Sequence, residues 1–185
     1  DGDPAAPPPR SGHAAARAPE GWDAVFIFGG YGADGCVGAG DFAACVEVDI
    51  LAGAGRWLPL APKGVPPSDR FGLSAVGRGH SIYVFGGAGR APQSDAAAAA
   101  GRAPDCVCHN DINVFSLQVP SKPVWRRDPH GHAFPGEAPR PRHSHGAALC
   151  GRRIVVVGGS TKGPYMPRDP FPEFLNDVHV LSLNG

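Results

Sequence analysis

Three short runs of apolar residues along the chain end in a pair of glycines. The runs extend over Ala24–Gly30, Ser81–Gly87 and Arg153–Gly159 and are rich in β-branched and aromatic side chains. An apolar run of this length, bounded by turn residues, predicts a strand buried on both faces. The paired glycines predict a turn in which a Cβ atom would clash. The repeated pairs are Gly29 and Gly30, Gly86 and Gly87, and Gly158 and Gly159.

A second pattern precedes each run and opens a hairpin with it. It starts with an arginine and occurs as Arg10–His13, Arg70–Leu73 and Arg142–His145. The interval from the arginine to the first glycine of the pair is the same in the second and third copies and longer in the first. The first hairpin therefore carries a short insertion, around Pro19 and Gly21.

Two further elements follow the glycines. Asn110–Leu117 and Asn176–Leu183 match each other closely and predict a third strand, of which Cys45–Ile50 is a degenerate first copy. A fourth short element is centred on Trp57 and then on Trp125, and the sequence has no third copy of it. We expect both tryptophans to pack between adjacent sheets.

The repeating unit is thus four short strands bounded by glycine and proline turns. It recurs at long intervals, from Arg10 to Arg70 and from Arg70 to Arg142, and no stretch shows a helical period. Four strands per long repeat are typical of a propeller blade. The sequence predicts an all-β fragment of a propeller over residues 1–185. Its three four-stranded antiparallel blades lie at about 9–60, 69–128 and 141–185, the third incomplete.

These residues resemble the kelch repeat over most of the chain, from about Pro9 to Leu183. The shared marks are the arginine opening, the glycine pair, the Asn-Asp-Val-type strand and the tryptophan. The sequence departs from the pattern at Leu73, at Ser144 and in the first copy, which lacks the Asn-Asp pair. The resemblance implies a ring with more blades than three, so we expect further blades from the rest of the chain or from another chain.

Three long and dissimilar loops connect the second and third strands of the repeats. They extend over about 31–43, 88–109 and 160–175, and the second is a low-complexity insertion containing Ala96–Ala100, for which we favour a poorly ordered tract. The third contains side chains typical of interface anchors, although its phenylalanines have the alternative of folding back over the blade edge. Its candidate partner-binding residues are Tyr165, Met166, Arg168, Phe171 and Phe174.

The repeat arginines form a second candidate site. The resemblance places Arg10, Arg70 and Arg142 near a mouth of the central channel, where forked guanidinium groups could bind an acidic peptide. The alternative, which we favour, is that each arginine stabilises a blade junction by pairing with a neighbouring blade's backbone or carboxylate.

Two motifs suggest other chemistry. Gly30–Gly35 fits G-x-G-x-x-G, but a dinucleotide site needs a helix directly afterwards, so we interpret it as a turn. Cys106–His109 supplies three possible metal ligands, whereas a structural zinc site needs four. No motif for a catalytic nucleophile is present. We expect no catalytic residue, cofactor or metal within this segment.

The bulk composition narrows the partners. Seventeen basic and 17 acidic side chains balance, which argues against general nucleic-acid binding and against a polybasic membrane patch. Five cysteines without a framework spacing indicate thiols in a reducing compartment, hence a cytoplasmic or nuclear location.

The function that the resemblance implies is a scaffold or adaptor that binds a protein. The alternative is the regulatory kelch domain of a multidomain enzyme, such as the kelch-type Ser/Thr phosphatases of plants and protists, with catalysis elsewhere.

Overall fold

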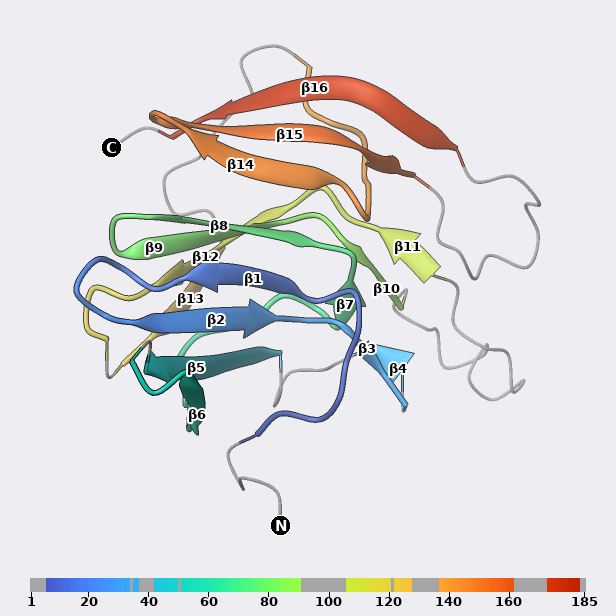
Figure 1. Cartoon of the computed structure of the whole chain (residues 1–185). Coiled ribbons are helices and arrows are strands. Elements are labelled where there is room, and N and C mark those ends of the chain that lie inside the picture. Colours follow the sequence, from blue (N-terminus) through green and yellow to red (C-terminus); the bar gives the residue numbers. More distant parts are fainter. Residues whose placement is uncertain are drawn as a thin grey trace.

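The computed structural model describes residues 6–33, 35–36, 42–49, 51–90, 106–120, 122–127, 137–161 and 173–183. Every regular element in these residues is a β-strand, and none of them forms a helix long and apolar enough to cross a membrane. Three antiparallel sheets lie face to face in sequence order, with the second between the other two (Figure 1). We call them blades 1, 2 and 3.

The strand order in each blade follows the chain. Blade 1 consists of β1 (Ala14–Arg17), β2 (Ala24–Phe28), β5 (Ala43–Asp49) and β6 (Ala54–Leu58). Blade 2 consists of β8 (Ser74–Arg78), β9 (Ser81–Phe85), β12 (Ile112–Ser116) and β13 (Val124–Arg127). Blade 3 consists of β14 (Gly146–Cys150), β15 (Arg153–Ser160) and β16 (Phe174–Ser182). The predicted four-stranded antiparallel repeat, with an incomplete third copy, is confirmed.

The blades meet through their first strands. β1 and β14 both lie against β8, so the three first strands lie side by side in Figure 1 while the later strands spread apart. This radial arrangement is that of a β-propeller, in which the first strands surround the axis. Each blade therefore has a rear face, turned toward the preceding blade, and a forward face, turned toward the following one.

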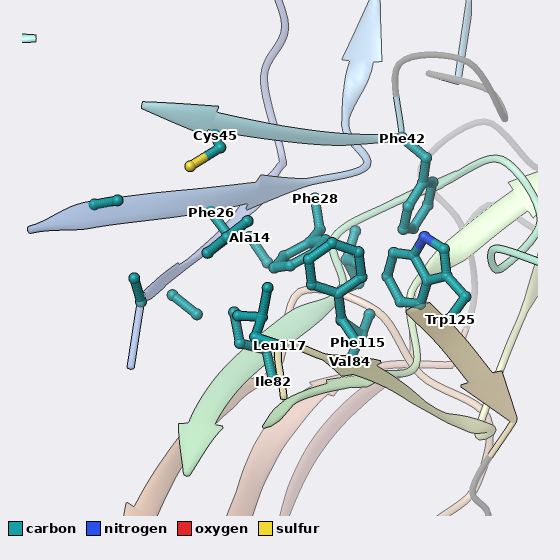
Figure 2. Packing of buried hydrophobic residues seen from close by; sticks show 14 residues of the cluster. Ala14, Phe26, Phe28, Phe42, Cys45, Ile82, Val84, Phe115, Leu117 and Trp125 are labelled. Atoms are coloured by element: carbon teal, nitrogen blue, oxygen red, sulfur yellow. The ribbon is translucent and has the colours of Figure 1, made fainter. Parts of the chain in front are cut away.

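Aromatic side chains fill the space between blades 1 and 2 (Figure 2). On the forward face of blade 1, Phe26 and Phe28 contact Phe115 of blade 2 edge-on, with ring centroids 5.4 Å apart in both pairs. The Trp125 indole is 3% exposed and contacts both Phe28 and Phe42. Edge-to-face pairs at these separations add to the stabilisation from burial. Trp125 therefore joins the two blades.

Aliphatic side chains dominate the space between blades 2 and 3. Tyr83 and Phe85 lie on the forward face of blade 2, and a side-chain hydrogen bond joins Ser74 Oγ and His145 Nε2 across the interface at 2.8 Å. The buried apolar members of this cluster are Val76, Tyr83, Phe85, Ile112, Val114, Ile154, Val156, Leu181 and Leu183. Alternate residues of β9 and β12 thus face opposite neighbours, because side chains alternate across a strand.

Backbone hydrogen bonds also join the blades, at the end marked by the glycine pairs, which we call the di-glycine end. Gly30 N donates to Arg70 O and Gly87 N donates to Arg142 O, both at 2.9 Å. A Cβ atom built on Gly29 would lie 2.5 Å from Arg70 O, and one on Gly86 would lie 2.9 Å from Arg142 O. Both positions also have positive φ, so glycine is needed for conformation and for space.

A second chain of backbone bonds runs nearer the axis. Gly72 N donates to Gly12 O, and Ser144 N donates to Gly72 O, both at 2.7 Å. All three residues have φ between 54° and 63°. Ser144 is the single non-glycine residue with positive φ in the described chain, and its hydroxyl is 2.9 Å from His143 Nδ1. The departure from the repeat pattern at Ser144 thus leaves a serine in the left-handed region.

Trp57 differs from the prediction that both tryptophans lie between blades. It is half-buried and belongs to neither core cluster. The pairing of Val46 with Trp57 matches that of Phe115 with Trp125, so Trp57 occupies the equivalent position on the rear face of blade 1. No sheet of the described chain covers that face, and the indole therefore remains partly exposed.

We expect this difference in burial to appear in the stability lost when each tryptophan is replaced by alanine. Trp125→Ala should lower the free energy of unfolding by about 3–5 kcal/mol, because it leaves a cavity among three phenylalanines. Trp57→Ala should cost less than about half as much, since its indole is only partly buried. Denaturant unfolding of both variants measures this, and equal costs would contradict the assignment of Trp57 to an uncovered face.

The positive φ of Ser144 predicts opposite changes in stability for two exchanges between serine and glycine. Ser144→Gly should leave stability unchanged or raise it by up to about 1 kcal/mol, because glycine adopts this φ without steric strain. Gly72→Ser should cost about 1–2 kcal/mol, since its Cβ would lie 3.0 Å from Ser144 N. Thermal unfolding of the two variants measures both effects. A marked loss of stability in Ser144→Gly would show that the serine side chain outweighs the backbone strain.

Candidate partner-binding face

The three repeat arginines are held in one geometry by their own blades. Arg10, Arg70 and Arg142 each donate through Nη1 to the carbonyl of the first glycine of the pair, at 3.1, 3.1 and 2.9 Å. Each also donates through Nε to the carbonyl two residues earlier, at 3.0–3.2 Å. The arginine thus ties the opening segment to the glycine turn in every repeat.

Two of these arginines also bind a carboxylate with both nitrogens of the fork. Arg70 Nη1 and Nη2 lie 2.5 and 3.3 Å from the Asp111 oxygens, and those of Arg142 lie 2.6 and 2.9 Å from the Asp177 oxygens. Both aspartates belong to the predicted Asn-Asp pairs. Each aspartate directly precedes the residue that pairs with the last residue before the glycine pair. In blade 1 that position is Phe42. The degenerate first copy therefore replaces an ion pair by an aromatic side chain that packs on Trp125.

The ion pairs change the acidity of both aspartates. Burial raises the pKa of Asp111, but the hydrogen bonds from Arg70 and Asn113 and the Arg70 charge outweigh it, so its pKa lies below the ordinary value. Hydrogen bonds from Arg142 hold the pKa of Asp177 far below its usual range. Because the Arg142 side chain is fully buried, its charge is neutralised inside blade 3.

The arginines therefore stabilise their own blades through side-chain contacts. The expected pairing with a neighbouring blade occurs through the Arg70 and Arg142 backbone carbonyls described above, not through the guanidinium groups. Partner binding by Arg10, Arg70 and Arg142 stays a prediction. Binding there would require a peptide to compete with donors that backbone carbonyls and, at Arg70 and Arg142, aspartates already occupy.

Paired segments emerge beyond the glycine pairs at the di-glycine end. In blade 1, β3 (Tyr31–Gly32) pairs with β4 (Gly35–Cys36). In blade 2, β10 (Ala88–Arg90) pairs with β11 (Cys106–Cys108) and with β7 (Arg70–Phe71). In blade 3, β15 and β16 continue past a bulge as far as the pairing of Ser160 with Phe174.

The three connections were predicted as loops over 31–43, 88–109 and 160–175, and the structure corrects their ends. The residue after each glycine pair resumes antiparallel pairing, because it bridges to the residue after the repeat arginine: Tyr31 to Ser11, Ala88 to Phe71, and Ser160 to His143. The hairpins thus start on a rigid base and lie together at one end of the molecule (Figure 1). The alanine run Ala96–Ala100 lies outside the described residues.

A groove of about 820 Å³ lies beside the β10–β11 hairpin of blade 2. One wall is the segment that leads from blade 1 into β7, and the other is formed by the hairpin and the ends of β12 and β13. The lining residues are Val65, Pro66, Pro67, Ser68, Arg70, Arg90, His109, Asp111, Asn113, Trp125 and Arg127. The lining thus combines apolar and aromatic side chains with a few polar and charged ones, a combination typical of binding sites.

The groove has an excess of positive charge. Asp111 is neutralised by Arg70, whereas Arg90 and Arg127 are exposed and form no ion pair within the described chain. Arg90 leans toward blade 1, where its Nη2 would lie 2.8 Å from a Cβ atom on Gly35. Val65 on the rim is 83% exposed. Positive charge next to an exposed apolar side chain favours a partner with both acidic and apolar residues.

His109 contributes the one groove side chain with a buried nitrogen that has no hydrogen-bond partner in the described chain, at Nε2. Burial lowers the pKa of His109, and the Arg70 charge lowers it further, so the imidazole is neutral near pH 7. A neutral imidazole can donate or accept one hydrogen bond at this nitrogen. Sequence reasoning considered His109 only as a metal ligand and missed this position, as it missed Arg90 and Arg127.

The other predicted sites are placed as follows. Phe174 is 79% exposed at the start of β16 and does not fold back over the blade, while Tyr165, Met166, Arg168 and Phe171 lie outside the described residues. Gly30–Gly35 includes β3 and the first residue of β4, which form a hairpin, in agreement with a turn.

Within the described ranges, no cluster of three or more His, Cys, Asp or Glu side chains is placed to hold a metal. The five cysteines are free thiols, and burial raises the pKa of Cys45 and Cys108 to about 11.

A second hollow, of about 850 Å³, lies on blade 1 at the end away from the glycine pairs. It lies between the turn before β2 and the β5–β6 hairpin, and its lining includes the exposed ion pair between Arg56 and Glu47. Because the hairpins of the di-glycine end do not reach this hollow, we place the candidate site in the blade 2 groove.

The radial sheets, the repeated glycine contacts and the arginine-aspartate pairs define a β-propeller segment built from kelch repeats. The profile of the KLHDC2/KLHL20/DRC7 Kelch-repeats domain matches residues 2–185, and the chain belongs to this family. The solved structure of YjhT, a kelch propeller, superimposes with a TM-score of 0.62 at 17% identity, covering 95% of this chain and 44% of that one. That likeness supports the fold.

Curated relatives are much longer proteins. The chain is 33% identical over 132 residues to Multiple epidermal growth factor-like domains protein 8 of Mus musculus, covering 70% of this chain and 4% of that protein. It is 25% identical to the Leucine-zipper-like transcriptional regulator 1 homolog of Drosophila melanogaster, covering 88% and 14%. It is 29% identical to Serine/threonine-protein phosphatase BSL2 of Arabidopsis thaliana, covering 62% and 9%. The chain thus spans only a small part of the length of each of these relatives.

The contact between blades 2 and 3 predicts a pH-dependent stability. Burial, followed by the charges of Arg142 and His143, lowers the pKa of His145 to about 4. In the unfolded chain this histidine binds a proton near its ordinary value of about 6.5. The unfolded state therefore holds more protons between these values, and stability should fall as the pH drops from about 6.5 to about 4. The loss should be on the order of 3 kcal/mol.

His145→Leu, which copies Leu73 of the preceding repeat, should remove most of this slope. His80→Gln, at an exposed turn, is the matched control and should retain the wild-type slope. Denaturant unfolding at several pH values measures both, and an unchanged slope in His145→Leu would show that another group is responsible.

Proposed function

We propose that this chain is the kelch portion of a protein-binding scaffold whose di-glycine end carries the contact surface. The observation that carries the proposal is the groove of blade 2, with its two exposed arginines, its neutral His109 and its exposed Val65 beside a hairpin. Loops held by a rigid scaffold are common binding elements. The blades supply that rigidity through backbone bonds and through arginine-aspartate pairs in which the arginine side chain is buried.

The partner we propose is an extended protein segment that carries acidic residues next to an apolar one. The carboxylates would accept hydrogen bonds from the Arg90 and Arg127 guanidinium groups, which donate to planar carboxylates in forked pairs. The apolar side chain would cover Val65 and the edge of the Trp125 indole. Because the arginines are exposed, their contribution should weaken with salt. A cytoplasmic or nuclear location agrees with free thiols and is part of this proposal.

The proposal predicts a charge-dependent loss of binding. Arg90→Glu combined with Arg127→Glu should weaken binding of a fluorescent Glu- and Leu-containing peptide at least tenfold, because it reverses both exposed charges of the groove. Fluorescence anisotropy at about 0.05 M and about 0.5 M salt measures the affinity and its screening. The same peptide with glutamine in place of glutamate should bind weakly to all proteins.

The matched control is Arg17→Glu combined with Arg126→Glu. Arg126 neighbours Arg127 on β13 but points to the opposite face of the sheet, and Arg17 lies on β1, so the net charge changes equally without touching the groove. If the control loses as much affinity as the groove variant, binding follows net charge and the groove assignment is wrong.

The likeness to BSL2 favours a second candidate, a regulatory kelch domain of a protein phosphatase with catalysis outside this segment. In that case the groove would select protein substrates. The groove variant of the full-length protein should then dephosphorylate protein substrates poorly while hydrolysing a small aryl phosphate normally. Full-length protein without activity on an aryl phosphate would exclude this candidate and leave the scaffold proposal intact.

A further inference from the structure

Arg90 lies at the junction of blades 1 and 2. It is the last residue of β10 and pairs with Cys106 of β11, but its side chain extends to the β3–β4 hairpin of blade 1. A Cβ atom built on Gly35 would lie 2.8 Å from Arg90 Nη2, 3.5 Å from Cζ and 3.9 Å from Nε. The guanidinium group therefore occupies the space that a side chain at this position would fill.

The hairpin that carries this glycine is held against both blades. Tyr31 N and Ser11 N each donate to the other's carbonyl, at 2.8 and 2.9 Å. The Tyr31 ring contacts Phe71 of blade 2, with centroids 5.8 Å apart. Burial raises the pKa of Cys36, while the charge of Arg90 and a hydrogen bond from the Arg90 backbone amide to the thiol oppose this rise. Two successive residues of β4 thus contact Arg90, so β4 supplies a fixed surface for this arginine.

We propose that Gly35 is a positioning residue for the recognition of acidic partners in the blade 2 groove. Because it has no side chain, the Arg90 guanidinium lies along β4 and presents its charge at the junction of blades 1 and 2. The carboxylate that binds Arg90 would then lie at this junction, while the apolar side chain of the partner covers Val65. This inference rests on the proposed function and adds to it a dependence on blade 1, none of whose described strands lines the groove.

An arginine that is already ordered loses less side-chain entropy when it binds a carboxylate. Ordering one long side chain corresponds to roughly a twofold to tenfold change in affinity. A Cβ atom at position 35 would meet Arg90 Nη2, the end of a long and flexible side chain, and no backbone atom. Gly29 differs, because a Cβ atom there would meet the Arg70 carbonyl. A substitution at position 35 should therefore move the arginine and leave the packing of the blades intact.

Fluorescence anisotropy with the Glu- and Leu-containing peptide and its glutamine counterpart measures the contribution of the carboxylates, as the ratio of the two affinities. Gly35→Ala should lower this ratio roughly twofold to tenfold. Gly21→Ala is the matched control, because both glycines have positive φ, 107° and 85°, but a Cβ atom on Gly21 meets no atom within 4 Å. The control should keep the wild-type ratio. An equally lowered ratio in the control would show that backbone strain is responsible, and would overturn the proposal.

The Arg90→Gln background separates positioning from a general structural role. With the guanidinium removed, Gly35→Ala should leave the affinity ratio unchanged, because effects that act through one group are not additive. Equal losses in both backgrounds would contradict the proposal. A wild-type ratio in Gly35→Ala would contradict it too and leave the proposed function intact, whereas a wild-type protein that binds neither peptide would overturn both.

Heteronuclear NMR relaxation of the arginine Nε–H groups tests the same contact in the wild-type protein, without altering β4. Arg90 Nε should be more ordered on the picosecond-to-nanosecond timescale than the Nε of the exposed Arg17. Arg90→Lys removes the signal and so assigns it. Equal mobility of the two Nε groups would show that Gly35 does not hold the arginine in place, and the proposal would be wrong.

Discussion

The structure depends on how closely successive blades approach each other at the di-glycine end. There the backbone of one blade contacts the carbonyl of the next blade's arginine, at a distance that leaves no room for a Cβ atom on Gly29 or Gly86. The same turn presents a carbonyl to the arginine side chain of its own blade. One short segment therefore fixes both the internal geometry of a blade and its position against the neighbour. The arginine and the glycine pair recur together because each is needed for the same contact.

This constraint also determines where the proposed contact surface lies. The residues after each glycine pair continue from a turn that is fixed by hydrogen bonds. Hairpins of different sequence therefore lie at one end of the molecule. The arginines that look most suited to binding are used inside the blades, where aspartates neutralise Arg70 and Arg142. The charges available to a partner are instead those of Arg90 and Arg127, which lie outside the repeat pattern. The framework is thus separate from the residues that we propose to contact a partner.

The packing between blades explains both the burial and the exposure in this chain. Blade 2 has a neighbour on each face, and its aromatic and aliphatic side chains are buried on both. Blades 1 and 3 each present one face of the same design without a neighbour in the described chain. Trp57 and Trp125 hold equivalent register positions and differ in burial for that reason alone. The repeat therefore defines a surface that is complete only when another sheet lies against it.

Much of the fold could be derived from the sequence because the repeat places glycines, arginines and apolar runs at matching intervals. The order of the strands, the antiparallel pairing and the incomplete third blade followed from that pattern, since strand pairing within a repeat is local. The hairpin ends were mispredicted, because the residues after the glycines carry no distinctive pattern and pair only once the arginine segment is beside them.

The candidate site was less accessible to sequence reasoning. Arg90 lies on β10, His109 follows β11 and Arg127 lies on β13, so only the folded blade brings these distant residues to one groove. By itself, the sequence determined the repeated unit and its family, because local spacing encodes strands and turns. The tertiary structure alone decided which charges are neutralised and which faces stay open, because both depend on neighbours that are distant in sequence.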